Sequence, residues 1–282
     1  MDWNKISTVL ITAFIILNIF LFVSSYNDIF SEEYDVTSDV EFIENMENIL
    51  KEKDIVISCK LPKETYLLPT LETEYEIINI DQELLTSFLG PGVEPIEDVT
   101  VYSNDKSEVL EIIDGKKLHY TIREKITGKI ISEDKLKEYI NKFIEDKKID
   151  TSGYSENYRN ISDNGSLVVY TKNYNNLSID NSYMYFYMDE DGIYRFEMQN
   201  IAAVKETAEK NRTFSAAEAL PKLLSFAEIK NKEITEIKMT YYSVEDENWQ
   251  FISGINSYPV WKVIFSDGTQ KHLSSMTTYN ID

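Results

Sequence analysis

The feature that most constrains this chain is the uncharged, apolar run from Ile6 to Val23 near its N-terminus. A helix rises about 1.5 Å per residue, so roughly 18 apolar residues reach the short end of what spans a hydrocarbon core of about 30 Å. Lys5 precedes the run, whereas Asp28, Glu32 and Glu33 follow it. Because positive charge beside a span tends to stay in the cytoplasm, we expect a single-pass cell-membrane protein with a cytoplasmic N-terminus and an extracellular body.

A cleaved signal peptide is the alternative interpretation of this run, because Val23-Ser24-Ser25 offers small residues to a signal peptidase. The length of the hydrophobic segment and the single lysine before it favour a retained anchor. No cysteine follows the segment closely enough to carry a lipid.

One stripe of the expected transmembrane helix carries polar side chains. Ser7, Ile11, Phe14 and Asn18 share this stripe, and an amide in lipid gains most by hydrogen bonding to another helix. The stripe is therefore a candidate contact with a partner's transmembrane helix. Alternatively, Asn18 lies near the outer interface and is hydrated.

Composition excludes one class of partner. The chain has 28 basic and 49 acidic side chains and a net charge of −21, so a polyanion such as nucleic acid is repelled. Cys59 is the only cysteine, which rules out an internal disulfide and a cysteine-cluster metal site. The body nevertheless has enough apolar residues for a core, and its length favours two domains.

The pattern of elements predicts an α+β fold, in which the transmembrane helix precedes two extracytoplasmic domains of antiparallel sheets packed with helices. We expect an anchor at residues 1–27, a first domain at 28–128 and a second at 129–282. In the first domain the patterns predict helices at 39–53 and 81–88, the latter capped by Asp81 and ended by Gly90, and strands at 55–61, 66–71, 75–80, 99–103, 108–113 and 118–123.

The second domain shows a helix followed by sheet, used twice. The first copy opens at Ser132 and closes with an aromatic hairpin at 183–196, whose turn contains Gly192. The second opens with a capping box at Ser215 and closes with a hairpin at 258–269. Further predicted elements are the strands 167–172 and 234–242 and a connecting helix from Ile201 to Glu209.

Catalytic signatures are scarce. The two histidines, His119 and His272, stand alone in strand contexts, and no nucleophile elbow, phosphate loop or zinc motif occurs. The acidic stretch from Asp189 to Gly192 lacks the remaining ligands of a calcium loop and is better explained as a hairpin turn. The sequence therefore predicts a protein that is not an enzyme and has no cofactor or metal.

Aromatic side chains crowd the second half of the chain. Because only alternate strand residues can face a core, some of these rings must face outward or cover another domain. Tyr and Trp are enriched at protein interfaces, which makes Tyr185, Tyr187, Trp249 and Trp261 candidates for a partner-binding face. The alternative is an aromatic-rich layer between sheet and helix.

Five stretches of the chain form a distinctive set: the opening Met1 to Lys5, the segment Phe14 to Leu21, a helix leading to a strand that ends at Leu61-Pro62, the helix end Phe88-Leu89-Gly90, and the strand Tyr258 to Val263. Together they resemble the YycI family of regulatory membrane proteins, which are associated with the WalK/WalR (YycG/YycF) two-component system of low-GC Gram-positive bacteria. The family has no active site to carry over.

This resemblance implies a YycH/YycI-like fold and a single-pass protein with an extracytoplasmic body. It implies a YycH-like partner and the sensor histidine kinase WalK (YycG), whose activity the membrane helices would set to control cell-wall homeostasis. The alternative function is a surface-anchored binding module for a cell-wall polymer or peptide, which would use the aromatic hairpins.

Overall fold

The computed structural model describes Phe14 and residues 36–122, 131–162, 165–245 and 248–276. Contacts divide the chain into two units, Met1–Ile49 and Leu50–Asp282. Within the described ranges, none of the helices combines the length and the apolar character needed to cross a membrane. The predicted transmembrane helix lies outside the described residues, except for Phe14, which is helical.

The described residues form a mixed α+β structure in which strands predominate. The helices are α2 (Val36–Lys51), α3 (Gln82–Leu89), α4 (Glu133–Lys147) and α5 (Ala216–Ala219), with 3-10 helices η1 (Leu220–Ser225), η2 (Ala227–Ile229) and η3 (Trp249–Phe251). The strands are β1 (Val56–Ile57), β2 (Leu67–Tyr75), β3 (Val101–Ser103), β4 (Val109–Ile113), β5 (Lys117–Thr121), β6 (Tyr154–Ser162), β7 (Gly165–Tyr174), β8 (Leu177–Asp189), β9 (Gly192–Gln199), β10 (Ile201–Arg212), β11 (Glu233–Tyr242), β12 (Gly254–Phe265) and β13 (Gln270–Ser274).

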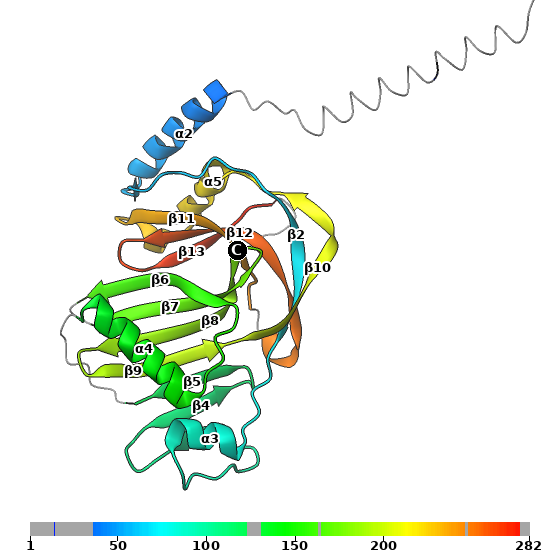
Figure 1. Cartoon of the computed structure of the whole chain (residues 1–282). Coiled ribbons are helices and arrows are strands. Elements are labelled where there is room, and N and C mark those ends of the chain that lie inside the picture. The colour runs from blue at the N-terminus through cyan, green and yellow to red at the C-terminus, as the bar shows by residue number, and fades with distance from the viewer. Residues whose placement is uncertain (1–13, 15–35, 123–130, 163–164, 246–247, 277–282) are drawn as a thin grey trace, which may run out of the picture. The chain divides into compact units, whose positions relative to one another are not determined.

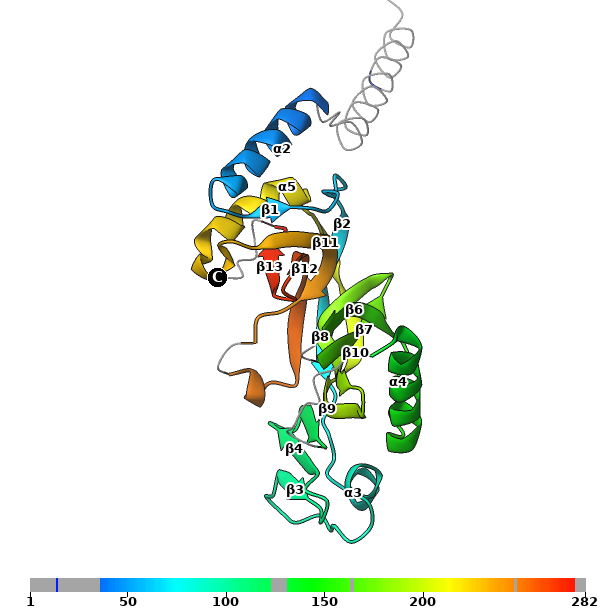
Figure 2. The same ribbon diagram turned by 90° about the vertical axis from the view of Figure 1, so that its left-hand side faces the viewer.

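Seven strands form one antiparallel group in the order β3-β4-β5-β9-β8-β7-β6. Helix α4 lies across one face of β6 to β9, as Figures 1 and 2 show. Phe196 of β9 is fully buried there. Its ring centroid lies 5.1 Å from that of Phe143 of α4 and 5.0 Å from that of Phe186 of β8. Aromatic packing thus holds the helix to this group of strands.

A second group is built around β12. Its C-terminal part pairs antiparallel with β11 and β13, and its N-terminal part pairs with β2, which in turn pairs with β10. Trp261 of β12 is 1% exposed, and its indole N–H donates to the carbonyl of Phe214, just before α5. The groups meet where β11 pairs with β8.

Local signals in the sequence explain several element ends. Asp81 accepts a hydrogen bond from the backbone N–H of Leu84 and caps α3, which ends at Gly90 with φ of +83°. The capping box of Ser215 and Glu218 opens α5. Both aromatic hairpins are present, formed by β8 with β9 and by β12 with β13. These predictions are confirmed.

Other sequence predictions are wrong. The segment from Ile201 to Glu209 is not a helix but most of β10, despite its helix-forming alanine, glutamate and lysine residues. Its backbone pairs with β2 from Ile201 opposite Tyr75 to Arg212 opposite Leu67, and this distant pairing overrides local preference. The strand expected at 55–61 is limited to β1. Two strand pairs, β1 with β11 and β8 with β11, are parallel.

The predicted domain boundary between residues 128 and 129 falls outside the described residues and stays a prediction. Strands from both sides of it pair directly, because β5 lies beside β9 from Lys117 opposite Gln199 to Thr121 opposite Arg195. Residues 50–282 form one compact unit by their contacts.

We expect Phe196→Ala to lower the free energy of unfolding by about 3–5 kcal/mol, because it removes a buried ring and leaves a cavity among three other rings. Phe251→Ala is the matched control, since Phe251 is 80% exposed and its loss should change stability by less than about 0.5 kcal/mol. Urea unfolding followed by circular dichroism measures both. Equal losses would contradict the placement of the core.

Candidate functional site

The two groups of strands separate along β8. Pairing between β8 and β11 is limited to Ser178 opposite Thr240 and Ile179 opposite Tyr241. Beyond these residues β8 continues with β7 and β9, while β11 continues with β12, as the two views in Figures 1 and 2 show. From Asp180 onward a hollow of about 260 Å³ opens between the groups, and we call it the wedge. Its lining comes from β5, β7, β8, β11, β12 and β13 and from the connection between β11 and β12.

A buried carboxylate lies at the narrow end of the wedge. One oxygen of Asp180, Oδ2, lies 3.0 Å from the ammonium of Lys262 and 2.7 Å from Nε2 of His272. The other, Oδ1, accepts hydrogen bonds from the hydroxyls of Ser178 and Thr240. Side chains from four strands, β8, β11, β12 and β13, therefore converge on one acid.

Charge governs the protonation of this acid. Burial by itself would raise the pKa of Asp180, but the ammonium of Lys262 and the hydrogen bond from His272 outweigh burial, so the pKa lies well below its usual range. The side chains of Asp180 and Lys262 are only 5% and 3% exposed. Asp180 is therefore an ionised carboxylate held in a buried ion pair at neutral pH.

A second acidic network lies beside the first. Glu245, in the connection between β11 and β12, accepts hydrogen bonds from Lys117 at 2.7 Å, from Gln199 at 2.7 Å and from Tyr75 at 3.0 Å. Burial opposes ionisation of Glu245, but these bonds, above all that from Lys117, lower its pKa. The network ties the connection to β2, β5 and β9.

A row of tyrosines follows β8, and two of its members, Tyr183 and Tyr185, form one wall of the wedge. Tyr183 and Tyr185 alternate along β8 and stack with ring centroids 4.4 Å apart, and Tyr187 continues the row 6.4 Å from Tyr185. The intervening Met184 and Phe186 are buried on the opposite face. Burial raises the pKa of Tyr187 to about 12 and also raises those of Tyr183 and Tyr185, so all three keep their phenol protons at neutral pH.

The four aromatic side chains predicted to form a partner-binding face lie in different surroundings. Tyr185 lines the wedge and contacts Tyr187, whereas Trp249 packs edge-on against Tyr75 with the amine of Lys117 4.1 Å from its ring centroid. Trp261 is buried in the second group of strands, so its ring is not at a surface of this unit. The four therefore do not share one face.

The membrane candidates Ser7, Ile11 and Asn18 lie outside the described residues, and Phe14 is 64% exposed. Sequence reasoning missed Asp180, Lys262 and Glu245. A signal existed for Lys262, because it interrupts the otherwise apolar stretch from Val260 to Phe265, where a lysine is expected only with a partner.

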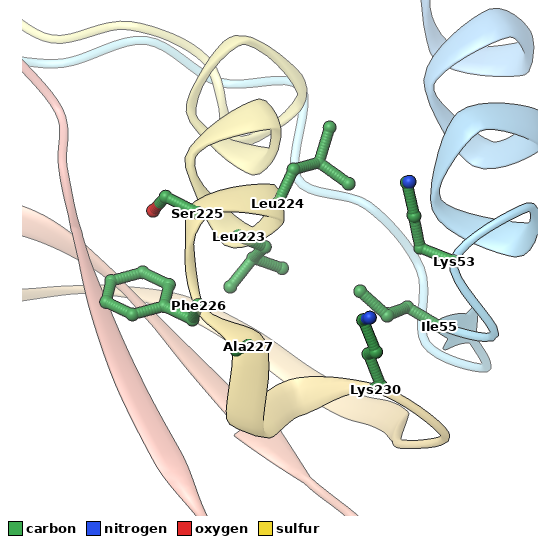
Figure 3. Close-up of a pocket in the computed structure, with 8 residues that line it drawn as sticks. All are labelled: Lys53, Ile55, Leu223, Leu224, Ser225, Phe226, Ala227 and Lys230. Carbon is green, nitrogen blue, oxygen red and sulfur yellow. The ribbon is translucent and has the colours of Figure 1, made fainter.

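A second hollow, of about 230 Å³, lies beside η1. Figure 3 shows Leu223 and Leu224 on one side of it and Lys53 and Lys230 on the side of Ile55. Both lysines are exposed, and the lining contains no acidic side chain. The convergent buried charges of the wedge make it the stronger candidate. Nowhere in the described ranges do three His, Cys, Asp or Glu side chains gather so that they could hold a metal ion.

Comparisons with known proteins give one family. The model of the YycI protein family matches residues 35–280. No curated protein matches the chain. Similar solved structures include an uncharacterised protein from Eubacterium rectale, with 11% identity, 85% of this chain and 99% of that chain covered and a TM-score of 0.47. YycH from Bacillus subtilis is 14% identical, the match covers 78% of this chain and 57% of YycH, and the TM-score is 0.48. The YpeB C-terminal domain from Bacillus megaterium is 11% identical, the match covers 72% of this chain and 96% of that domain, and the TM-score is 0.39.

We expect Lys262→Met to lower the free energy of unfolding by about 3–5 kcal/mol, because it leaves the buried charge of Asp180 without its ammonium partner. Lys205→Met removes the same group from an ion pair with Glu72 in which both side chains are more than half exposed, and it should change stability little. Urea unfolding of both variants measures the difference. Similar small losses would show that the Asp180 pair is not a buried, stabilising contact.

Stability should also depend on pH through Asp180. Its pKa is lower in the folded than in the unfolded chain, where a value of about 3.9 applies, so its contribution is present above about pH 4 and is lost as the pH falls further. Asp180→Asn removes this contribution, so its unfolding free energy should fall less steeply below pH 4 than that of the wild type. Urea titrations at several pH values test this, and parallel curves would refute it.

Proposed function

The chain belongs to the YycI family, and we propose that it regulates a WalK-type sensor histidine kinase together with a YycH-like partner, thereby controlling cell-wall homeostasis signalling. The match to the family model over residues 35–280 is the observation that carries this proposal. The match extends over both groups of strands and includes the wedge, so the body as well as the anchor would take part.

We propose that residues 1–27 anchor the protein in the cell membrane by a single span, with the N-terminus in the cytoplasm and the body outside. The uncharged run from Ile6 to Val23 and the charge difference between Lys5 and Asp28 support this orientation. The kinase would then be reached in two places, within the bilayer and outside it.

Within the bilayer, the stripe of Ser7, Ile11, Phe14 and Asn18 is the proposed contact with the transmembrane helices of the kinase. A polar contact between helices contributes on the order of 0.6–2 kcal/mol, which changes the ratio of two helix packings several-fold. A regulator of this kind needs no chemistry, only a different affinity for the two states.

Outside the membrane, Tyr187 and Trp249 are the aromatic candidates that are partly exposed and do not line the wedge, whereas Tyr185 lines the wedge and Trp261 is buried. We propose that Tyr187 and Trp249 contribute to extracytoplasmic contacts with the YycH-like partner or the kinase. Aromatic rings at an interface combine a large apolar area with few rotatable bonds.

The proposed role is binding without turnover. Asp180 and His272 are an acid–imidazole pair like that of a catalytic triad, but Asp180 contacts Nε2, the nitrogen that faces the nucleophile in a triad. Within the described residues the ring of His272 hydrogen-bonds only to Asp180. No serine or cysteine of the described residues is therefore placed for His272 to activate, and its bond instead joins β13 to β8.

Kinase autophosphorylation in a reconstituted bilayer tests the proposal. The assay compares full-length protein, Asn18→Leu and a body truncated before Asp28, each with and without the YycH-like partner, and Asn4→Leu serves as the matched amide control outside the span. We expect full-length protein and Asn4→Leu to change the rate several-fold, and Asn18→Leu and the truncated body to lose most of that change.

Correct insertion is verified by protease protection before the rates are compared. If inserted full-length protein leaves the rate unchanged in every combination, the regulator proposal fails. If Asn18→Leu behaves as full-length protein while the truncated body is inactive, the anchor is needed but the polar stripe is not the contact.

A further inference from the structure

The wedge presents hydrogen-bonding groups that the chain itself does not use. Among the described residues, the hydroxyls of Tyr183 and Tyr185 and the side-chain amide of Gln270 have no hydrogen-bond partner, although all three residues line the hollow. A phenol hydroxyl can donate and accept, and an amide does both through different atoms. These groups are therefore available to a ligand or to water.

A fourth unused group lies behind the lining, hydrogen-bonded to the lining residues Asn181 and Glu245. Gln199 is fully buried, and its Nε2 donates to the carbonyl of Asn181 and to Glu245. Because the carbonyl of Asn181 can only accept, this amide cannot be turned over, and its Oε1 is left as a buried acceptor with no partner within the described residues. A buried polar atom without a partner in a native protein calls for an explanation, such as a bound water or ligand.

The charged side chains that line the wedge disfavour an ionic ligand. The ammonium of Lys262 lies 3.0 Å from Asp180, and that of Lys117 lies 2.7 Å from Glu245, so each cation is already paired with an acid. A ligand charge brought into this half-buried space would have no counter-charge and would lose its hydration. The ligand that fits is neutral.

The walls of the wedge favour a ring. The stacked pair of Tyr183 and Tyr185 comes from one group of strands, and a second stacked pair, Tyr242 with His272, comes from the other, with ring centroids 3.8 Å apart. The hollow of about 260 Å³ is smaller than the range of about 300–1,000 Å³ that holds drug-sized ligands. A small ring with apolar C–H faces and hydroxyl or amide groups at its edge suits both the walls and the unused groups.

We infer that the wedge is a binding site for a neutral saccharide ring, with the hydroxyls of Tyr183 and Tyr185 as its principal hydrogen-bonding groups. The site goes beyond the proposed kinase regulation and rests on different residues. Saccharide binding and kinase regulation can therefore fail separately in their assays.

The test titrates the full-length protein in detergent micelles with N-acetylglucosamine, and saturation-transfer NMR and calorimetry detect binding. Tyr183→Phe/Tyr185→Phe keeps both rings and removes only hydroxyls that have no hydrogen-bond partner among the described residues, so we expect unchanged thermal unfolding. Binding should be about tenfold weaker, because two hydrogen bonds to the ligand are lost. Tyr187→Phe is the matched control in the same row, outside the lining, and should bind within about twofold of the wild type.

Two further ligands test whether the bound saccharide is neutral and whether it is a free sugar or the end of a polymer. Glucuronate, whose carboxylate would be unpaired in the wedge, should bind more weakly than N-acetylglucosamine. A β-1,4-linked trisaccharide of N-acetylglucosamine that binds more tightly than the single sugar points to a polymer end, whereas equal affinity points to a free sugar. Absence of saturable binding by the wild type, full binding by the double variant, or tighter binding of glucuronate would each overturn the inference.

Discussion

One buried carboxylate joins the two groups of strands where their backbone pairing ends. Asp180 receives hydrogen bonds or charge from Thr240 of β11, Lys262 of β12 and His272 of β13, while it belongs to β8. Backbone bonds between β8 and β11 extend over only two residue pairs, so these side chains carry much of the connection. Removing either partner of a buried ion pair leaves an unpaired buried charge, so the connection depends on both Asp180 and Lys262. Here it links β8 to β11, β12 and β13 at the point where the wedge begins.

Features governed by short stretches of chain were predictable from the sequence. The cap at Asp81, the capping box at Ser215 and the glycine-bearing hairpin turns depend on residues within a few positions of one another. Strand alternation puts Tyr185 and Tyr187 on one face of β8, but it could not show that Tyr185 lines a hollow. The span from Ile6 to Val23 lies outside the described residues and stays a prediction.

Features governed by distant pairing were not predictable. Strand β10 has a helix-forming composition and becomes a strand because β2, far earlier in the chain, offers it a complete edge. The wedge depends on the same kind of information, since Asp180 and His272 are 92 residues apart. From the sequence alone, His272 is interpreted as an isolated strand histidine. Asp180 lies beside it only because β13 pairs with β12 and β11 pairs with β8.

Strand β12 gives the body a mechanical property. Its residues Gly254 to Ser257 pair with β2, and from Tyr258 onward it pairs with β11, so one continuous strand joins β2 to β11 within the second group. Sliding β12 along its axis would break hydrogen bonds on both sides at the same moment. Tension applied along β2 is therefore passed through β12 as shear into β11 and β13, so these strands bear load together instead of separating one after another.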